Sequence, residues 1–245
     1  PKANIIVCSG LDEQLMINAS MAAGAKAFLA KPIEMNKLFQ TIIMCSDLRI
    51  IAEMGHIGAE RSASVLSKLT KQPIQVELSR LEAGPPRLLA GLSGVSDRPV
   101  TVIKMGLQTK PNCDALLVFE SSEATKIAKI MMETSGRSEI QEIQMSAVKE
   151  LGSNMICAFF AGVADFADLS LVPSPPTMTT DDLSSVVNVF LAQQTMPVNL
   201  VLIFQIQIKR KTGSAFGFFI LIPSAEFQKQ LIDAGKKSVS LTALA

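Results

Sequence analysis

Two short stretches of the sequence place a carboxylate and a second polar side chain three residues apart. The first pair is Glu53 and His56, the second is Glu150 and Ser153, and the offset is 150 − 53 = 97 residues. On an α-helix, residues three apart lie on one face, so each pair can contact a single partner together. A histidine can also position or deprotonate a water molecule near neutral pH. The two stretches are therefore candidates for polar or acid–base chemistry on a helix surface.

Other kinds of chemistry find little support in the sequence. His56 is the single histidine, and the four cysteines form no C-x-x-C pair, so no metal site is expected. The net charge is +1, and basic residues do not cluster, which argues against a nucleic-acid partner. Hydrophobic residues make up 48% of the chain and charged residues 18%, which indicates a globular protein.

No stretch has the pattern of a membrane span or an export signal. The apolar run from 198 to 208 is interrupted by Asn199, Gln205 and Gln207, and falls short of the roughly 20 residues that a membrane helix needs. The first residues lack the charged leader and cleavage site of a signal peptide. Widely spaced cysteines suit a reducing compartment. We therefore expect a cytoplasmic protein without membrane insertion.

Among the elements that the sequence predicts, the first 46 positions have the pattern strand, helix, strand and helix. We predict a strand over 4–8, a helix over 12–23, a short strand over 27–29 and a helix over 35–44. Two strands cannot form a sheet that covers both helices, so this is a partial α/β segment.

From residue 47 onward, one order of elements occurs twice. The first half, about 47–134, has a long helix over 47–70, a strand over 74–78, a hairpin over 101–119 and a helix over 122–133. The second half, about 139–236, has a helix over 139–167, a strand over 169–172, a hairpin over 198–222 and a helix over 225–234. We predict a duplicated α+β fold with pseudo-twofold symmetry, in which two long helices pack on one shared antiparallel sheet.

Residues 1–46 resemble the C-terminal part of a CheY-like, flavodoxin-like receiver domain. The matching positions are Ser9, Gly24-Ala25, Phe28 and Lys31-Pro32. The resemblance implies that Ser9 and Lys31 contact a phosphoryl group and that Phe28 is the switch residue. In that family the phosphorylated Asp and the metal-binding acids come earlier, so the segment resembles half an active site. Singly, Ser9 could be a helix cap and Lys31 a surface lysine before a turn.

Residues 47–245 resemble the CheC/CheX family of chemotaxis phosphatases. That family reads Glu-Ile-Gly-Asn-Ile-Gly-Ala-Gly-Asn-Ala-Ala-Thr-Ala-Leu-Ser, and residues 53–67 read Glu-Met-Gly-His-Ile-Gly-Ala-Glu-Arg-Ser-Ala-Ser-Val-Leu-Ser. In the family, the Glu engages a lysine of the phosphorylated CheY-type receiver, and the Asn orients the attacking water. The family also has an Asp or Ser four before the Glu, and a Pro 23 after the Asn.

The first half departs from this pattern more than the second. It has Arg49, His56 and Ser79 at the acid, Asn and Pro positions, so only Glu53 matches and the first site is predicted to be degenerate. A packing role is the simpler interpretation of His56.

In the second half the pattern is better kept, because Ser146, Glu150 and Pro176 all match. The Asn position is Ser153, and Asn154 follows, rotated by about 100° around the helix. These five residues are the predicted catalytic set. The alternative is that Glu150 is a solvated charge and that Pro176 stiffens a loop.

The resemblance implies hydrolysis of an aspartyl phosphate on a CheY-type receiver, with no cofactor held by this chain and magnesium bound by the receiver. It also implies the CheD deamidase as a candidate partner. The alternative is a binding module that docks receivers or other chemotaxis proteins without hydrolysis. A third possibility is a structural role, as in flagellar-switch relatives of the family.

Overall fold

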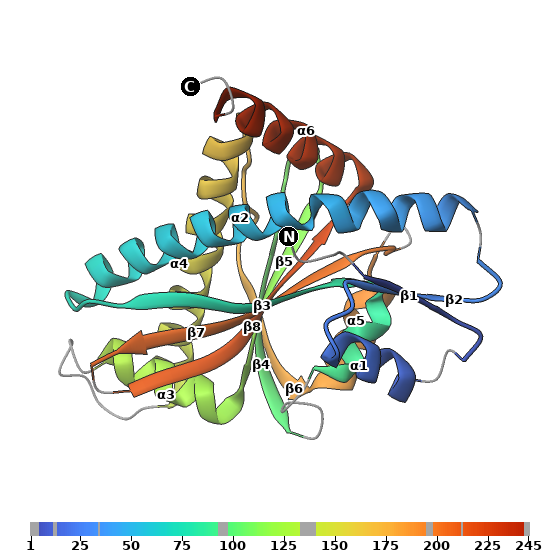
Figure 1. Cartoon of the computed structure of the whole chain (residues 1–245). Helices are drawn as coiled ribbons and strands as arrows, with labels where there is room; N and C mark the ends of the chain where they lie inside the picture. The colour runs from blue at the N-terminus through green and yellow to red at the C-terminus, as the bar shows by residue number, and fades with distance from the viewer. Residues whose placement is uncertain are drawn as a thin grey trace.

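One long helix joins a small N-terminal α/β segment to a larger part built on an antiparallel sheet (Figure 1). The computed structural model describes residues 5–11, 14–33, 35–92, 98–132, 141–194, 198–211 and 213–242. In the helices, the side chains of residues 35–37, 39, 40, 42–49, 130–132, 141 and 235–242 are outside this description.

The N-terminal segment contains two parallel strands and one helix between them. Strand β1 (Ile6–Ser9) pairs with β2 (Ala27–Ala30), and helix α1 (Gln14–Ala22) connects them. This confirms the predicted order of strand, helix and strand. Little of the segment is buried, because Ile5, Leu11 and Leu15 are each more than half exposed.

Helix α2 (Met35–Thr70) follows without a break for 36 residues. The prediction of two separate helices, over 35–44 and 47–70, is therefore wrong. Neither Gly nor Pro occurs between residues 35 and 54, so no residue there favours a kink. Ile51 and Met54 are buried in the main core. The boundary predicted between residues 46 and 47 falls inside this helix.

The main sheet has six strands, in the order β3-β7-β8-β5-β4-β6, and all neighbours are antiparallel. The strands are β3 (Gln75–Gly84), β4 (Pro99–Gly106), β5 (Cys113–Glu120), β6 (Thr177–Asp182), β7 (Val201–Arg210) and β8 (Gly213–Pro223). Both predicted hairpins are confirmed, as β4 with β5 and β7 with β8.

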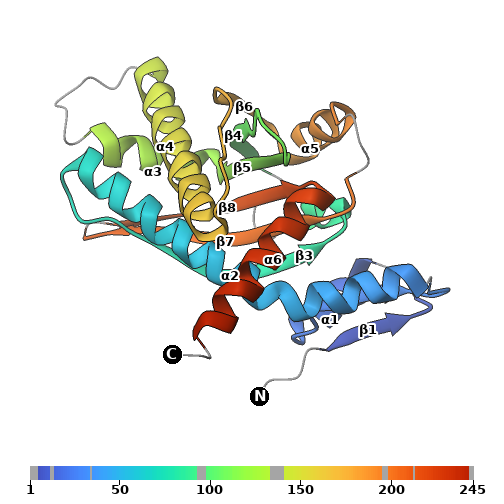
Figure 2. The ribbon, with the colours of Figure 1, turned by 90° about the horizontal axis from the view of Figure 1, so that it is seen from above.

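Two apolar clusters flank the sheet. Helices α2, α3 (Ser121–Met132), α4 (Gln141–Ala167) and α6 (Ala225–Thr242) contribute to the larger cluster, and Figure 2 shows α2, α4 and α6 lying across the sheet. The 3-10 helix η1 (Pro86–Gly91) and helix α5 (Leu183–Ala192) contribute Leu89 and Phe190 to the smaller cluster. Since apolar side chains alternate between the clusters along β7 and β8, both faces of the sheet are largely covered.

One predicted strand is absent, and three elements, η1, β6 and α5, were not predicted. Residues 169–172 form no strand, and only an isolated bridge joins Leu107 to Pro173. Strand β6 follows instead, with the polar sequence Thr-Met-Thr-Thr-Asp-Asp, which lacks the apolar alternation that would reveal a strand. Asp182 then caps α5 by accepting a hydrogen bond from the backbone N–H of Ser185 (3.1 Å).

The strand order is unchanged when first-half and second-half elements are exchanged. If β3 is exchanged with β6, β4 with β7 and β5 with β8, the strand order becomes β6-β4-β5-β8-β7-β3, which is the observed order read from the other edge. Helices α2 and α4 exchange in the same way, as do α3 and α6. Duplication of the sequence itself stays a prediction.

Candidate functional site

The exposed side of α4 carries the second-half residues. Ser146 and Glu150 are exposed and lie one turn apart, and Ser153 and Asn154 follow half-buried on the next turn. The carboxylate of Glu150 makes no ion pair or hydrogen bond with any described residue. It is therefore available to a cation supplied by a partner. We call the surface of Ser146, Glu150, Ser153 and Asn154 the α4 face.

Ser153 and Asn154 converge on one acceptor. The hydroxyl of Ser153 and the amide Nδ2 of Asn154 both donate to the backbone carbonyl of Glu150, at 3.0 and 2.9 Å. Bonds of this kind to carbonyls one turn back are common for short polar side chains in helices. Helix α4 has no irregular turn, so nothing rotates Asn154 into the place of Ser153. The structure thus brings both polar groups close to Glu150, with the hydroxyl hydrogen of Ser153 and one of the two amide hydrogens of Asn154 already used.

Pro176 lies at the start of the edge strand beside this face. Gly152 of α4 rests on Ile103 of β4, where an added Cβ would come within 3.0 Å of the Ile103 side chain. Ile103 in turn pairs with Met178 of β6, two residues after Pro176. The predicted loop that ends at Pro176 is therefore next to the strand that supports Glu150 and Ser153.

The exposed side of α2 carries the first-half residues. Glu53 and His56 are both exposed, and neither makes a hydrogen bond or ion pair within the described part of the chain. Exposure shows that His56 is not a buried packing residue. We call the surface of Glu53 and His56 the α2 face. Ser79 sits at a bulge in β3 and donates to the carbonyl of Gln205 (3.3 Å), while the side chain of Arg49 is outside the description.

The two helices are locked together where they cross. The hydroxyl of Ser62 on α2 donates to the carbonyl of Met155 on α4 (3.0 Å), and Arg61 forms an ion pair with Asp165. The ring of Phe159 covers Gly58 so closely that a Cβ there would come within 2.1 Å of it. These contacts fix the α2 face relative to the α4 face.

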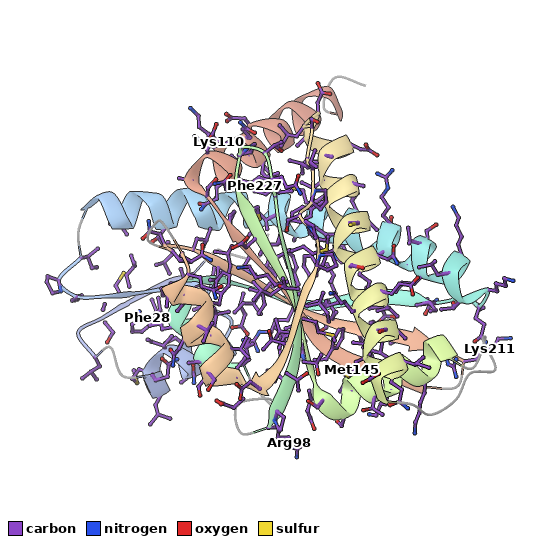
Figure 3. All side chains as sticks on the ribbon, turned by 180° about the vertical axis from the view of Figure 1, so that it is seen from behind. Phe28, Arg98, Lys110, Met145, Lys211 and Phe227 are labelled. Atoms are coloured by element: carbon purple, nitrogen blue, oxygen red, sulfur yellow. The ribbon has the colours of Figure 1, made fainter. Side chains whose placement is uncertain are left out.

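The N-terminal residues meet at one edge of the small sheet. Ser9 ends β1 and pairs with Ala30, and the next residue, Lys31, donates its backbone N–H to the carbonyl of Ser9 (2.7 Å). Phe28 lies half-buried on β2. In Figure 3, Phe28 and Met145 of α4 lie on opposite sides of the molecule, so this edge is remote from the α4 face.

An exposed thiol on α4 was not singled out from the sequence. Cys157 lies one turn beyond Asn154. Its side chain is exposed, but the neighbouring atoms that partly bury it raise the pKa of the thiol above the ordinary value. Its exposure depends on which side of α4 faces the core. The spacing of apolar residues in this helix predicts that side only weakly. Among the described residues, no group of three or more His, Cys, Asp or Glu side chains could hold a metal ion. No described helix is long and apolar enough to cross a membrane.

Comparison with known proteins identifies a sequence relative and several structures of similar fold. No protein-family profile matches the sequence. Over 146 residues, the chain is 24% identical to the CheY-P phosphatase CheC of Bacillus subtilis (strain 168), which covers 57% of this chain and 68% of that protein.

The structural similarity extends further along the chain. Thermotoga maritima FliY has a TM-score of 0.63 at 20% identity, covering 77% of this chain and 95% of FliY. The FliM middle domain from H. pylori has a TM-score of 0.56 at 13% identity, covering 76% and 97%. FliM in the H. pylori FliG-FliM complex has a TM-score of 0.53 at 13% identity, covering 77% and 98%. The chain therefore has a CheC/FliY/FliM-like fold and is related in sequence to CheC.

Proposed function

We propose that this chain is a chemotaxis phosphatase that hydrolyses the aspartyl phosphate of a CheY-type receiver docked on the α4 face. The observation that carries the proposal is the exposed carboxylate of Glu150, which pairs with no residue that the structure describes and has two polar side chains one turn away. The sequence relationship to a CheY-P phosphatase supports this chemistry.

Each residue of the α4 face has a role in this proposal. The carboxylate of Glu150 would bind the active-site lysine of the receiver in a charge-assisted hydrogen bond. The hydroxyl oxygen of Ser153 or the Oδ1 of Asn154 would accept a hydrogen bond from the attacking water, since both keep acceptor capacity. Ser146 and Pro176 would border the docked receiver. Catalysis would come from positioning, and magnesium would be bound by the receiver.

The N-terminal segment belongs to the same proposal. We propose that it is the C-terminal part of a receiver-like unit, because Ser9 and Lys31 meet at the end of two parallel strands. The exchangeable strand order likewise supports the proposed duplication of the second part. CheD remains a further partner to be tested.

A docking module without hydrolysis is the second candidate, and one observation favours it. Ser153 stands at the Asn position of the family pattern, and its one hydroxyl hydrogen is bonded to the carbonyl of Glu150, so it cannot donate to a phosphoryl oxygen without first breaking that bond. FliM, which shares this fold, was solved in complex with FliG, and this is consistent with a binding role or a structural role.

The test is the decay of a phosphorylated CheY-type receiver in the presence of this chain. Glu150→Gln should slow the accelerated decay by about tenfold or more, because a hydrogen bond between charged groups contributes roughly 1.5–3 kcal/mol. Ser153→Asn should raise it about tenfold by restoring an amide that can donate and accept. Glu142→Gln, an exposed carboxylate two turns earlier on α4, is the matched control and should change nothing.

Binding of the same receiver separates the two candidates. If the wild type binds the receiver without accelerating its decay, and only the Ser153→Asn variant accelerates it, the chain is a docking module. If neither protein binds or accelerates decay, the proposed function is wrong.

A further inference from the structure

Five basic residues meet at one end of the molecule, although the sequence keeps the two groups 209 − 71 = 138 positions apart. We call this surface the basic end, and its members are Lys68, Lys71, Lys209, Arg210 and Lys211. Nη1 of Arg210 donates to Oε1 of Gln72 (3.4 Å), so the turn between β7 and β8 lies beside the turn that follows α2. Figure 3 shows Lys211 at the outer edge of the molecule.

Positive charge is concentrated at the basic end. Residues 64–77 and 205–213 contain five basic residues and one acid, Glu77, so their net charge is 5 − 1 = +4. Because the whole chain has a net charge of +1, the rest of it has a net charge of 1 − 4 = −3. Glu77 bonds to Lys209, while the lysines at the end of α2 and in the turn after β7 are exposed. The fold therefore forms a cationic surface that the order of residues along the chain does not show.

The fold does not require cations at these positions. A lysine near the C-terminus of a helix can simply stabilise the helix dipole. The corresponding positions at the end of α4, 97 residues later, are Asp165 and Asp168. Lys71 and Asp168 also share the same left-handed backbone conformation, each with φ 53°. Equivalent turns thus accept either charge, so the fold alone does not account for the lysines at the end of α2.

The basic end adjoins the α4 face along one side of α2. Arg61 forms an ion pair with Asp165 and donates to the carbonyl of Ala161 (3.1 Å), so its side of α2 lies beside α4. Lys68 comes seven residues after Arg61, and Asn154 comes seven residues before Ala161. Seven residues are close to two whole turns of a helix. Lys68 and Asn154 therefore lie on the sides of their helices that meet at this contact.

The two helices also bring these residues to a similar level. Gly58 of α2 packs on the ring of Phe159. Four residues later, Ser62 bonds to Met155, which lies four residues earlier on α4. Each turn forward along α2 thus corresponds to one turn back along α4. The last turns of α2 lie level with the turns of α4 that carry the α4 face.

We propose that the basic end is a second docking surface for the phosphorylated receiver, and that it attracts the acidic surface around the phosphorylation site of the receiver. This inference rests on the proposed function, because it assumes that a receiver docks on the α4 face. The phosphoryl group is anionic, and a receiver that holds magnesium needs carboxylates to bind the metal. The α4 face contains one acid, Glu150, and no cation. The basic end supplies the cations.

The area that a protein partner needs supports this surface. A stable interface buries roughly 800 Å² on each partner and involves roughly 20–30 residues, far more than the four of the α4 face. A receiver docked there must also cover neighbouring elements, and α2 is the helix that packs most extensively on α4 among the described residues. Complementary charges at the rim of an interface mainly raise the rate of association. The basic end should therefore affect encounter and not chemistry.

The experiment compares the wild type with the double variant Lys68→Glu and Lys211→Glu, and measures receiver association and receiver decay. At about 0.05 M salt, the association rate and kcat/KM should fall about tenfold, while kcat with saturating receiver stays the same. At about 0.5 M salt, the difference should fall below about twofold, because salt screens exposed charges. Lys68→Arg with Lys211→Arg should restore the wild-type rate.

The matched control is Lys110→Glu with Lys229→Glu. It makes the same change in net charge, at an exposed hairpin turn and an exposed helix position. In Figure 3, Lys110 and Lys211 lie at different ends of the molecule. The control should change the association rate by less than about twofold. An equal loss in the control would show a general effect of net charge and would overturn the inference.

The other outcomes distinguish this inference from the proposed function. If the wild type binds the receiver without hydrolysis and the double variant binds more slowly, the basic end is supported and the phosphatase proposal fails. If Glu150→Gln slows decay but the double variant associates normally, the phosphatase proposal stands and the basic end is overturned.

A membrane surface is the competing partner for a cationic patch. Vesicles that contain phosphatidylserine test it. If the double variant loses binding to these vesicles but keeps normal receiver association, the basic end binds lipid and the inference is overturned. If the wild type binds no receiver, both proposals are wrong. A normal unfolding transition for each variant excludes misfolding as the cause.

Discussion

The α4 face matches the family pattern in more residues than the α2 face does, but more of its polar groups are bonded to the helix backbone. The α4 face keeps more of the expected residues, but the hydroxyl of Ser153 and one amide N–H of Asn154 are bonded to the carbonyl of Glu150. The α2 face keeps only the glutamate, yet Glu53 and His56 are both exposed and neither is bonded to another residue within the described part of the chain. A match in residue type therefore does not measure whether a polar group can reach a partner.

Side-chain length explains the difference. Ser and Asn are short enough to bond to a carbonyl three or four residues back, as Ser153 and Asn154 do. The larger imidazole of His56 is exposed and makes no such bond. A longer side chain on a helix surface can thus be more available to solvent and ligands than a shorter one of similar polarity.

The largest expected effect breaks both faces together. Phe159 is 4% exposed, its ring lies 4.4 Å from that of Phe219, and it covers Gly58 where α2 and α4 cross. Phe159→Ala should lower the free energy of unfolding by about 3–5 kcal/mol, through lost burial and a cavity.

Chemical denaturation followed by circular dichroism measures this change, since the chain has no Trp or Tyr for fluorescence. Phe216→Ala, at a ring that is 48% exposed, is the control and should change stability by less than about 0.5 kcal/mol. A loss below about 1 kcal/mol for Phe159→Ala would contradict the packing role assigned to this ring.

A smaller effect distinguishes how tightly each helix is seated. Gly55→Ala forces a Cβ against the buried ring of Phe204, which should cost about 1–3 kcal/mol of steric strain, offset by roughly 1 kcal/mol of helix propensity. Gly152→Ala meets only the Ile103 side chain at 3.0 Å, so its stability should stay within about 0.5 kcal/mol of the wild type. If the two variants lose the same free energy of unfolding in the same denaturation experiment, α2 and α4 pack equally closely on the sheet and the prediction is wrong.

The smallest effect tests the α4 face by its chemistry. Alkylation of Cys157 with N-ethylmaleimide, in a Cys8→Ser and Cys45→Ser background, should reduce turnover on the α4 face a few-fold. Because burial raises the pKa of this thiol, less thiolate is present at neutral pH, and the alkylation rate should increase as the pH is raised.

Turnover before and after alkylation, with Cys157→Ser as the unreactive control, checks this prediction. Unchanged turnover after complete alkylation would contradict the placement of the reaction on the α4 face.

Much of the fold could be predicted from the sequence, because long helices and apolar hairpins repeat in order. The elements that were missed have weak local signals. Strand β6 is polar because it lies at an edge of the sheet, where pairing with β4 stabilises it. The continuity of α2 through Ser46 and Asp47 was missed because the boundary was placed where the two family resemblances meet, between residues 46 and 47.

The candidate site could be predicted only as a set of positions. The three-residue spacing placed Glu150 with Ser153, and Glu53 with His56, on the same exposed faces. The shared acceptor of Ser153 and Asn154 depends on rotamers, and the exposure of Cys157 and His56 depends on how each helix is rotated on the sheet. Neither can be derived from residue types and spacing alone.

The unbroken helix α2 also limits how the protein can change in length. Each residue inserted between positions 45 and 50 would turn the N-terminal segment by about 100° around the helix axis and move it about 1.5 Å farther away. Insertions or deletions of about seven residues, close to two whole turns, would restore the original direction. Homologues that keep this junction should therefore differ there by whole turns or not at all.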